Sequence, residues 1–257
     1  LVRACKICGN SVVPRHQVER AMYFHCSACD FLQNFYWEDH RGEAHAQEAA
    51  NDEARARLWQ PGSAEHERKK AWEILGLMTS PIAWRSRTIH ALLRSIPAYE
   101  RWQRYRAHRK LKRVLDFGCG SGALVREFLY EGFECIGLDP FAPPNTPHVL
   151  RTSLTNARLR GESFDGIFAI ETMEHISDVL GTFREIARIL RPGGMFFVQT
   201  RRLEDPDYQT QQERWFYLRE PTTHVSIYST TAFRRIARKT GFRSVQFRGV
   251  KFARFKK

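Results

Sequence analysis

The stretch that decides the fold runs from residue 114 to residue 122 and reads Val114-Leu-Asp-Phe-Gly-Cys-Gly-Ser-Gly122. Its apolar first half predicts a buried strand, and three glycines follow at alternate positions. Apolar residues then recur at helical spacing, at Leu124, Val125, Phe128 and Leu129. A strand, a glycine loop and a helix N-terminus together predict a nucleotide-binding turn, because glycine lets the backbone approach a ligand closely.

The glycines alone leave the kind of nucleotide open. Gly118, Gly120 and Ala123 also satisfy the dinucleotide pattern G-x-G-x-x-G/A. Asp116 favours a different ligand, since a carboxylate beside the turn would repel a pyrophosphate but attract a cationic amino group. S-adenosylmethionine carries an ammonium and a sulfonium and no phosphate. Asp139 follows about 20 residues later, after the next apolar stretch, where either cofactor would place its ribose.

From residue 111 onward the chain resembles the class I S-adenosylmethionine-dependent methyltransferases. The resemblance rests on the D-x-G-x-G-x-G loop and the acid at Asp139, with two later motifs. Phe164-Asp-Gly-Ile-Phe-Ala-Ile170 is similar to the fourth strand of that family, and Leu190-Arg-Pro-Gly-Gly is similar to the turn before the fifth. It implies an α/β, Rossmann-like fold with a doubly wound, seven-stranded, mostly parallel sheet. A doubly wound domain that binds another nucleotide is the alternative.

The same resemblance assigns the cofactor contacts. The methionine end of the cofactor would lie in the glycine loop, the ribose at Asp139, and the adenine beside Ser153 and Leu154. Glu171, just after the fourth strand, would orient the cofactor. The loop residues that carry this prediction are Asp116, Gly118, Cys119, Gly120 and Gly122.

Composition divides the chain into three predicted regions. Residues 1–36 bear cysteines and look strand-like, residues 37–110 look helical, and residues 111–257 alternate strand and helix as a parallel sheet requires. Residues 200–228 form a long polar and aromatic insertion, which we interpret as a lid. We expect a cytoplasmic protein, because neither a secretory leader nor an apolar run of membrane-spanning length is visible. Since the chain starts at Leu1 and not at Met, a missing upstream segment stays an open alternative.

The first region carries two cysteine pairs. Cys5 and Cys8 form one C-x2-C knuckle, and Cys26 and Cys29 form another after an intervening segment of hairpin length. Two such knuckles can supply the four thiolates of a tetrahedral Zn²⁺ site, so we predict a structural zinc ribbon. The alternative is that the four cysteines form two disulfides. Disulfides are typical of secreted domains, whereas the rest of this sequence resembles an intracellular protein. The ribbon would either bind nucleic acid or pack against the catalytic domain and form part of an acceptor cleft.

A cluster of carboxylates and imidazoles follows the fourth predicted strand, in the stretch Glu171-Thr-Met-Glu-His175. His224 lies in the lid, ahead of the last predicted helix. The pattern E-x-x-E-H with a later His resembles two groups, the ubiquinone-pathway O-methyltransferases and the small-RNA 3′-end 2′-O-methyltransferases. That resemblance implies that Glu171, Glu174, His175 and His224 hold Mg²⁺ or another divalent ion. In the metal-free alternative, His175 or His224 is the general base and Glu174 supports it.

The acceptor is the least determined prediction. Trp215, Tyr217 and Tyr228 of the lid would line an acceptor pocket, with lid packing as their alternative role. This length of aromatic lid favours O-methylation of a small or medium-sized metabolite, such as a phenol or a sugar hydroxyl, including one on a glycan. RNA is the alternative acceptor, because the chain has 41 Lys+Arg against 28 Asp+Glu, a net charge of +13. The alternative in which the protein is not an enzyme is a catalytically silent methyltransferase-like domain that binds RNA or acts as an assembly module.

Overall fold

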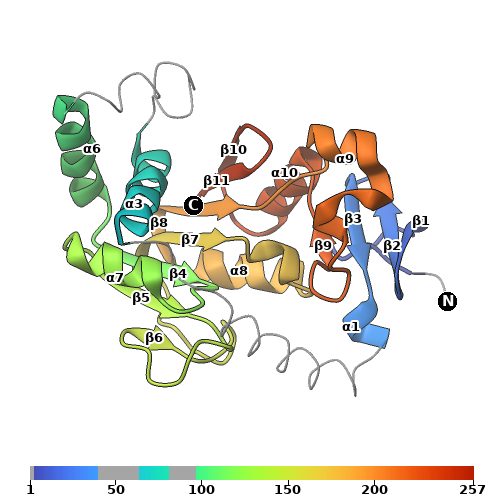
Figure 1. Ribbon diagram of the computed structural model, residues 1–257, viewed down its shortest axis with the longest axis horizontal. Coiled ribbons are helices and arrows are strands. Elements are labelled where there is room, and N and C mark those ends of the chain that lie inside the picture. Colours follow the sequence, from blue (N-terminus) through green and yellow to red (C-terminus); the bar gives the residue numbers. More distant parts are fainter. Residues whose placement is uncertain (1–2, 40–63, 81–96) are drawn as a thin grey trace.

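The computed structural model describes residues 3–39, 64–80 and 97–257. It contains a seven-stranded sheet and a separate four-stranded sheet, which lie at opposite sides of Figure 1. The larger sheet is formed by strands between residues 113 and 256 and carries the glycine loop. The smaller sheet begins with the cysteine-bearing N-terminal strands.

The seven-stranded sheet has the order β10-β11-β8-β7-β4-β5-β6. The strands β4 to β8 run parallel to one another, and β10 and β11 form an antiparallel hairpin on β8. The order reverses between β4 and β7, and in open α/β sheets ligands bind at the carboxyl ends of the strands at such a reversal. The predicted doubly wound, mostly parallel sheet is therefore confirmed. Its strands are β4 (Arg113–Phe117), β5 (Glu134–Leu138), β6 (Val149–Leu150), β7 (Phe164–Ile170), β8 (Leu190–Gln199), β10 (Ser244–Arg248) and β11 (Phe252–Lys256).

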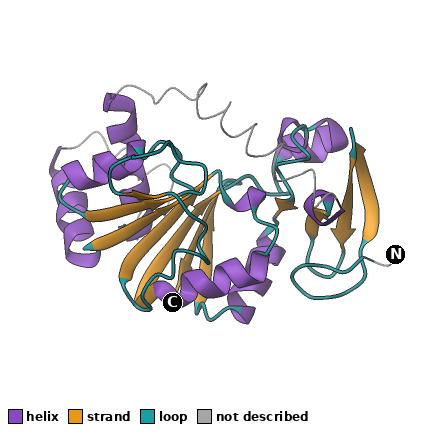
Figure 2. Cartoon of the chain, turned by 90° about the horizontal axis from the view of Figure 1, so that it is seen from below, coloured by secondary structure: helices purple, strands orange, loops and turns teal. Residues whose placement is uncertain are grey.

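Helices cover both faces of this sheet, as Figure 2 shows. Neighbouring strand residues face opposite layers: Phe196 packs in the cluster with Phe183 of α8, and Phe197 packs in the cluster with Leu75 of α3. This alternation follows from the two-residue period of a strand. One layer holds α8 (Val179–Ile189) and α10 (Thr230–Lys239), and the other holds α3 (Ala64–Thr79), α6 (Pro97–Lys110) and α7 (Ala123–Tyr130).

The four-stranded sheet joins two distant parts of the chain. Its order is β1-β2-β3-β9, with every pairing antiparallel. The first three strands are β1 (Val13–Val18), β2 (Ala21–Cys26) and β3 (Phe31–Asn34), and the short helix α1 (Tyr36–Asp39) follows them. The fourth, β9 (Ser226–Ile227), comes from the lid, as Figure 1 shows. The sequence predicts a ribbon and a lid but no connection between them.

The predicted lid, residues 200–228, contains short helical segments joined by turns. It contains α9 (Pro206–Gln211) and the 3₁₀ turns η2 (Gln212–Arg214) and η3 (Phe216–Leu218). Its aromatic side chains pack with Tyr23 and Leu32 of the ribbon in a common buried cluster. The lid and the ribbon therefore share a hydrophobic core.

The predicted helical region is described only in part. The helices α3 and α6 lie within residues 37–110, whereas residues 40–63 and 81–96 fall outside the described chain. Residues 101–113 hold seven Lys/Arg and no acid, and they form most of α6 and the first residue of β4. Among the described helices, none is long and apolar enough to cross a membrane.

Candidate active site

The glycine loop follows β4 and adopts a backbone that only glycine takes readily. Gly118, Gly120 and Gly122 all have positive φ, at 77°, 51° and 71°. A Cβ atom on Gly118 would lie 2.3 Å from Oγ1 of Thr172, so the loop packs tightly against the end of β7 there. A Cβ on Gly120 would meet no described atom within 4 Å. The loop therefore leaves open space at Gly120, where a ligand can approach the backbone.

Asp116 lies in β4, two residues before Gly118, and is almost completely buried, with 2% of its surface exposed. Burial raises the pKa of its carboxyl to about 8, and Asp139 and Glu67 raise it further while Lys70 lowers it. A buried carboxyl of this kind is stabilised in its charged form by a cation. The ammonium of a methionine moiety fits that need. The sequence did not indicate Glu67 and Lys70, because α3 precedes the motif by some 40 residues and carries no cofactor pattern.

Asp139 follows β5 and is tied to the backbone around it. Its Oδ2 accepts a hydrogen bond from the amide of Gly120 at 2.9 Å, and its Oδ1 accepts one from the amide of Phe141 at 2.8 Å. Each carboxylate oxygen has a second lone pair, so a ribose hydroxyl could still bind. Leu154 is buried, with 5% of its surface exposed, and Ser153 is partly buried in the same turn. The roles of these residues toward ribose and adenine stay predictions.

Glu174 is the most unusual carboxylate of the site. It lies in the 3₁₀ turn η1 (Met173–His175) after β7 and has no exposed surface. Neither of its carboxylate oxygens makes a hydrogen bond of normal geometry in the part of the chain that the structure describes, but Oε1 lies 3.9 Å from Nε2 of His175. Burial raises the pKa of Glu174 to about 8, with a smaller contribution from the charge of Glu171, while the hydroxyls of Tyr217 and Thr200 lower it. A buried carboxyl with so few hydrogen bonds is costly, which suggests a ligand or an ion at this position.

Two histidines lie next to Glu174 in matching tautomers. Nδ1 of His175 donates to the carbonyl oxygen of Thr223 at 3.0 Å, and Nδ1 of His224 donates to that of Tyr217 at 2.6 Å. A carbonyl oxygen can only accept, so in the neutral imidazoles Nε2 carries the lone pair. The two rings lie 4.9 Å apart, and ligand atoms of Glu174, His175 and His224 fall within 4.8 Å of one another. This arrangement suits either a metal ligand set or a general base.

Glu171 lies outside that three-residue group. Its Oε2 accepts from the hydroxyl of Tyr217 at 3.0 Å, and its Oε1 accepts from Nε2 of Gln199 at 3.2 Å. Glu171 also has a positive φ of 48°, a sparsely populated conformation for a residue other than glycine. Its predicted roles, as a cofactor contact and as a fourth metal ligand, stay predictions.

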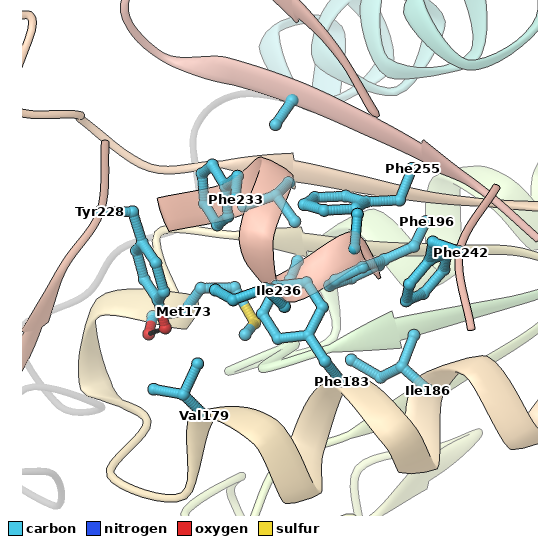
Figure 3. Close-up of a cluster of buried hydrophobic side chains, with 14 of the residues drawn as sticks. Met173, Val179, Phe183, Ile186, Phe196, Tyr228, Phe233, Ile236, Phe242 and Phe255 are labelled. Atoms are coloured by element: carbon cyan, nitrogen blue, oxygen red, sulfur yellow. Dashed lines mark hydrogen bonds between the residues drawn. The ribbon is translucent and has the colours of Figure 1, made fainter. Parts of the chain in front are cut away.

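The three aromatic residues predicted to line an acceptor pocket are all buried. Trp215 and Tyr228 have no exposed surface, and Tyr217 has 3%. The ring of Tyr228 stacks on Phe233 at 4.5 Å, and its hydroxyl donates to the carbonyl oxygen of Met173 at 2.9 Å (Figure 3). Trp215 packs against Tyr208 and Tyr217 within the lid. Trp215 and Tyr228 are therefore packed among other aromatic side chains, whereas the hydroxyl of Tyr217 also reaches Glu171. The role of all three toward an acceptor stays a prediction.

The four predicted zinc ligands lie together. Ligand atoms of Cys5, Cys8, Cys26 and Cys29 fall within 4.8 Å of one another, and Sγ of Cys8 is 3.6 Å from Sγ of Cys26. A tetrahedral site with Zn–S bonds of about 2.3 Å places its sulfurs about 3.8 Å apart. The amide of Ile7 donates to Sγ of Cys5, which stabilises a thiolate ligand. The cluster is thus suited to one tetrahedral metal ion.

Comparison with known proteins identifies the class of the larger domain. Residues 84–246 match a family model described as a methyltransferase domain, and the match covers more than half of the chain. The chain therefore belongs to the methyltransferase domain family, and this domain is that of an S-adenosylmethionine-dependent methyltransferase. Membership of this family supports S-adenosylmethionine as the methyl donor.

The curated relatives match a shorter segment. The chain is 32% identical over 102 residues to the ubiquinone biosynthesis O-methyltransferase of Aliivibrio fischeri, covering 35% of this chain and 44% of the relative. It is 36% identical over 101 residues to the enzyme of the same name from Methylocella silvestris, covering 34% of this chain and 39% of the relative. The chain thus spans less than half of the length of these relatives. Among solved structures, an S-adenosylmethionine-dependent methyltransferase from Archaeoglobus fulgidus is 21% identical with a TM-score of 0.45, over 64% of this chain and 73% of that one.

Proposed function

We propose that the protein transfers the methyl group of S-adenosylmethionine to a hydroxyl oxygen of a small or medium-sized acceptor, a phenol or a sugar hydroxyl. The observation that carries the proposal is the cluster of Glu174, His175 and His224 at the carboxyl end of β7. It lies beside the glycine loop, since β7 and β4 are neighbours in the sheet and Thr172 packs under Gly118. The names of the curated relatives support an oxygen acceptor.

The chemistry assigned to these residues is proton removal. Nε2 of His224 would take the proton of the acceptor hydroxyl as its oxygen attacks the methyl carbon, and the bond from that carbon to sulfur breaks. The sulfonium becomes the neutral thioether of S-adenosylhomocysteine, and the proton stays on the imidazole. The carbonyl of Tyr217 would hold the resulting imidazolium through Nδ1. Glu174 would stabilise the positive charge once it is ionised.

A divalent ion such as Mg²⁺ fits the same cluster. Glu174, His175 and His224 would hold it, and the complete burial of Glu174 beside both imidazoles supports this ligand role. Such an ion would lower the pKa of an acceptor hydroxyl. We further propose that Cys5, Cys8, Cys26 and Cys29 hold one structural Zn²⁺, because four thiolates fill every tetrahedral position.

The acceptor class is tested by incubating the protein and methyl-labelled cofactor with a fractionated cell extract. Label in the metabolite fraction, lost in His224→Ala, is the expected result. Label confined to RNA, with a steep loss between low and moderate salt, would instead support RNA as the acceptor. Cofactor binding without label in any fraction would support a catalytically silent domain.

A further inference from the structure

We propose that the zinc ribbon positions His224, and that Asn34 and Tyr23 are the two positioning residues through which it acts. The inference rests on the proposed role of His224 as base or metal ligand. Neither residue touches the reacting atoms; both hold the backbone of His224. The sequence places them some 200 residues away from the histidine, and the contact arises only because β9 of the lid joins the ribbon sheet.

Asn34 is the last residue of β3 and is completely buried. Its Nδ2 donates to the carbonyl oxygen of Pro221 at 2.8 Å and lies 3.4 Å from that of His224. Its backbone amide donates to the carbonyl oxygen of Val225 at 3.1 Å. One ribbon residue therefore binds the lid segment on both sides of the histidine.

Tyr23 provides a second bond to the same place. It lies in β2 without exposed surface, and its hydroxyl donates to the carbonyl oxygen of His224 at 2.7 Å. Burial raises the pKa of Tyr23 above its ordinary value, so the phenol remains a donor throughout the physiological range. The carbonyl of His224 thus receives a phenol and an amide donor, both from the ribbon.

The other side of the segment is held by the active site itself. The amide of Val225 donates to the carbonyl oxygen of Glu174 at 2.8 Å, and Nδ1 of His175 donates to that of Thr223 at 3.0 Å. The backbone of residues 221–225 therefore lies between the ribbon and the turn η1. A shift of the ribbon would move His224 relative to Glu174 and His175.

The cysteine cluster lies at the ends of the same strands. Cys26 is the last residue of β2, and Cys29 precedes β3 by two positions. The hydroxyl of Ser229, which caps α10, donates to the carbonyl oxygen of Cys29 at 3.3 Å. Next to it, β3 pairs with β9 through Leu32 with Ile227 and Gln33 with Ser226. A metal bound by the four thiols would therefore fix the strands that carry Tyr23 and Asn34.

The experiment uses two variants that remove the donors. Tyr23→Phe deletes one hydroxyl, and Asn34→Leu keeps the size and branching of the side chain but removes the Nδ2 donor, together with the Oδ1 acceptor of the Tyr36 amide. The control is Gln17→Ala, because Gln17 is an amide of the same ribbon sheet, in β1. Its side chain donates to the carbonyl oxygen of Glu19 at 2.8 Å, within the ribbon and outside the cysteine knuckles.

Two readouts separate positioning from general damage. The first is the imidazole ¹⁵N resonances of His224 in the zinc-loaded protein, which need no turnover. The second is kcat for methyl transfer to the metabolite fraction of a cell extract, with KM for the cofactor measured beside it. We expect the His224 signals to shift and kcat to fall roughly 10–100-fold in Tyr23→Phe and Asn34→Leu, as is common when the partner of an active-site residue is lost. The cofactor KM and every value for Gln17→Ala should stay within about twofold of wild type.

The outcomes are distinct. Unchanged His224 signals in both donor variants would overturn the proposal, as would an equal shift in Gln17→Ala, which would indicate loosening of the whole ribbon. Shifted signals with an unchanged kcat would uphold the positioning of His224 and contradict its role in the proposed reaction. Loss of kcat without any shift would place the effect of the ribbon elsewhere and overturn the proposal.

Discussion

The buried carboxyl of Glu174 predicts that this protein becomes less stable as the pH rises toward 8. Its pKa is raised from 4.5 to about 8 by burial. Between these two values the unfolded chain releases the proton while the folded chain keeps it, so the unfolded state binds fewer protons. The free energy of unfolding therefore falls with rising pH in this window. At pH 7 the loss from this one group is about 3 kcal/mol, from 1.36 kcal/mol per pKa unit.

Glu174→Gln removes this ionisation while it keeps the size of the side chain. We expect urea unfolding of wild type and variant, without added divalent ion, to diverge between pH 5 and pH 8, with the variant gaining about 3 kcal/mol relative to wild type by pH 7. Ionisable groups that do not interact with Glu174 cancel in the difference, so the divergence reports Glu174 together with its neighbours Glu171 and His175. Parallel stability curves would show that Glu174 does not hold a raised pKa. If Mg²⁺ binds at Glu174, adding it should restore the stability of wild type only.

The remaining predictions concern the cofactor loop and the ribbon. Asp116→Asn should weaken S-adenosylhomocysteine binding at least tenfold in calorimetry, and wild-type binding should weaken as the pH falls below 8, because the buried carboxyl must ionise to pair with the ammonium. Gly118→Ala should cost about 2–4 kcal/mol in chemical denaturation, because its Cβ would clash with Thr172 at a positive φ, whereas Gly120→Ala should cost less. Elemental analysis should find one zinc per chain after reductive purification and none in Cys26→Ala; an unchanged zinc content in that variant would exclude the four-thiolate site.

The sequence predicted the larger sheet and its loop because their signals are local. The glycines after residue 117 need positive φ, and an apolar strand with a helical pattern behind it specifies the turn wherever it occurs. The proximity of Glu174 and His175 could also be predicted from the sequence, since both residues lie in one short segment. Local backbone chemistry was sufficient for these features.

The connection between ribbon and lid could not be predicted in this way. β9 has two residues, too few to show a period, and its partner β3 lies almost 200 residues earlier. Asn34 carries no motif, and its importance comes only from the carbonyl groups that folding brings to it. Trp215 and Tyr228 illustrate the same limit: their aromatic character predicts contact with an acceptor, but it does not predict the neighbours against which both are buried.

The central claim is that Glu174, His175 and His224 serve transfer of a methyl group to oxygen. The most direct measurement supplies cofactor with a ¹³C-labelled methyl group to the wild-type protein and to His224→Ala, together with the metabolite fraction of an extract, and identifies the labelled product by NMR. We expect a carbon resonance typical of an O-methyl group with wild type and a loss of at least 100-fold in its rate of formation with the variant. A labelled N-methyl or C-methyl product, or an O-methyl product formed equally fast by His224→Ala, would contradict the account.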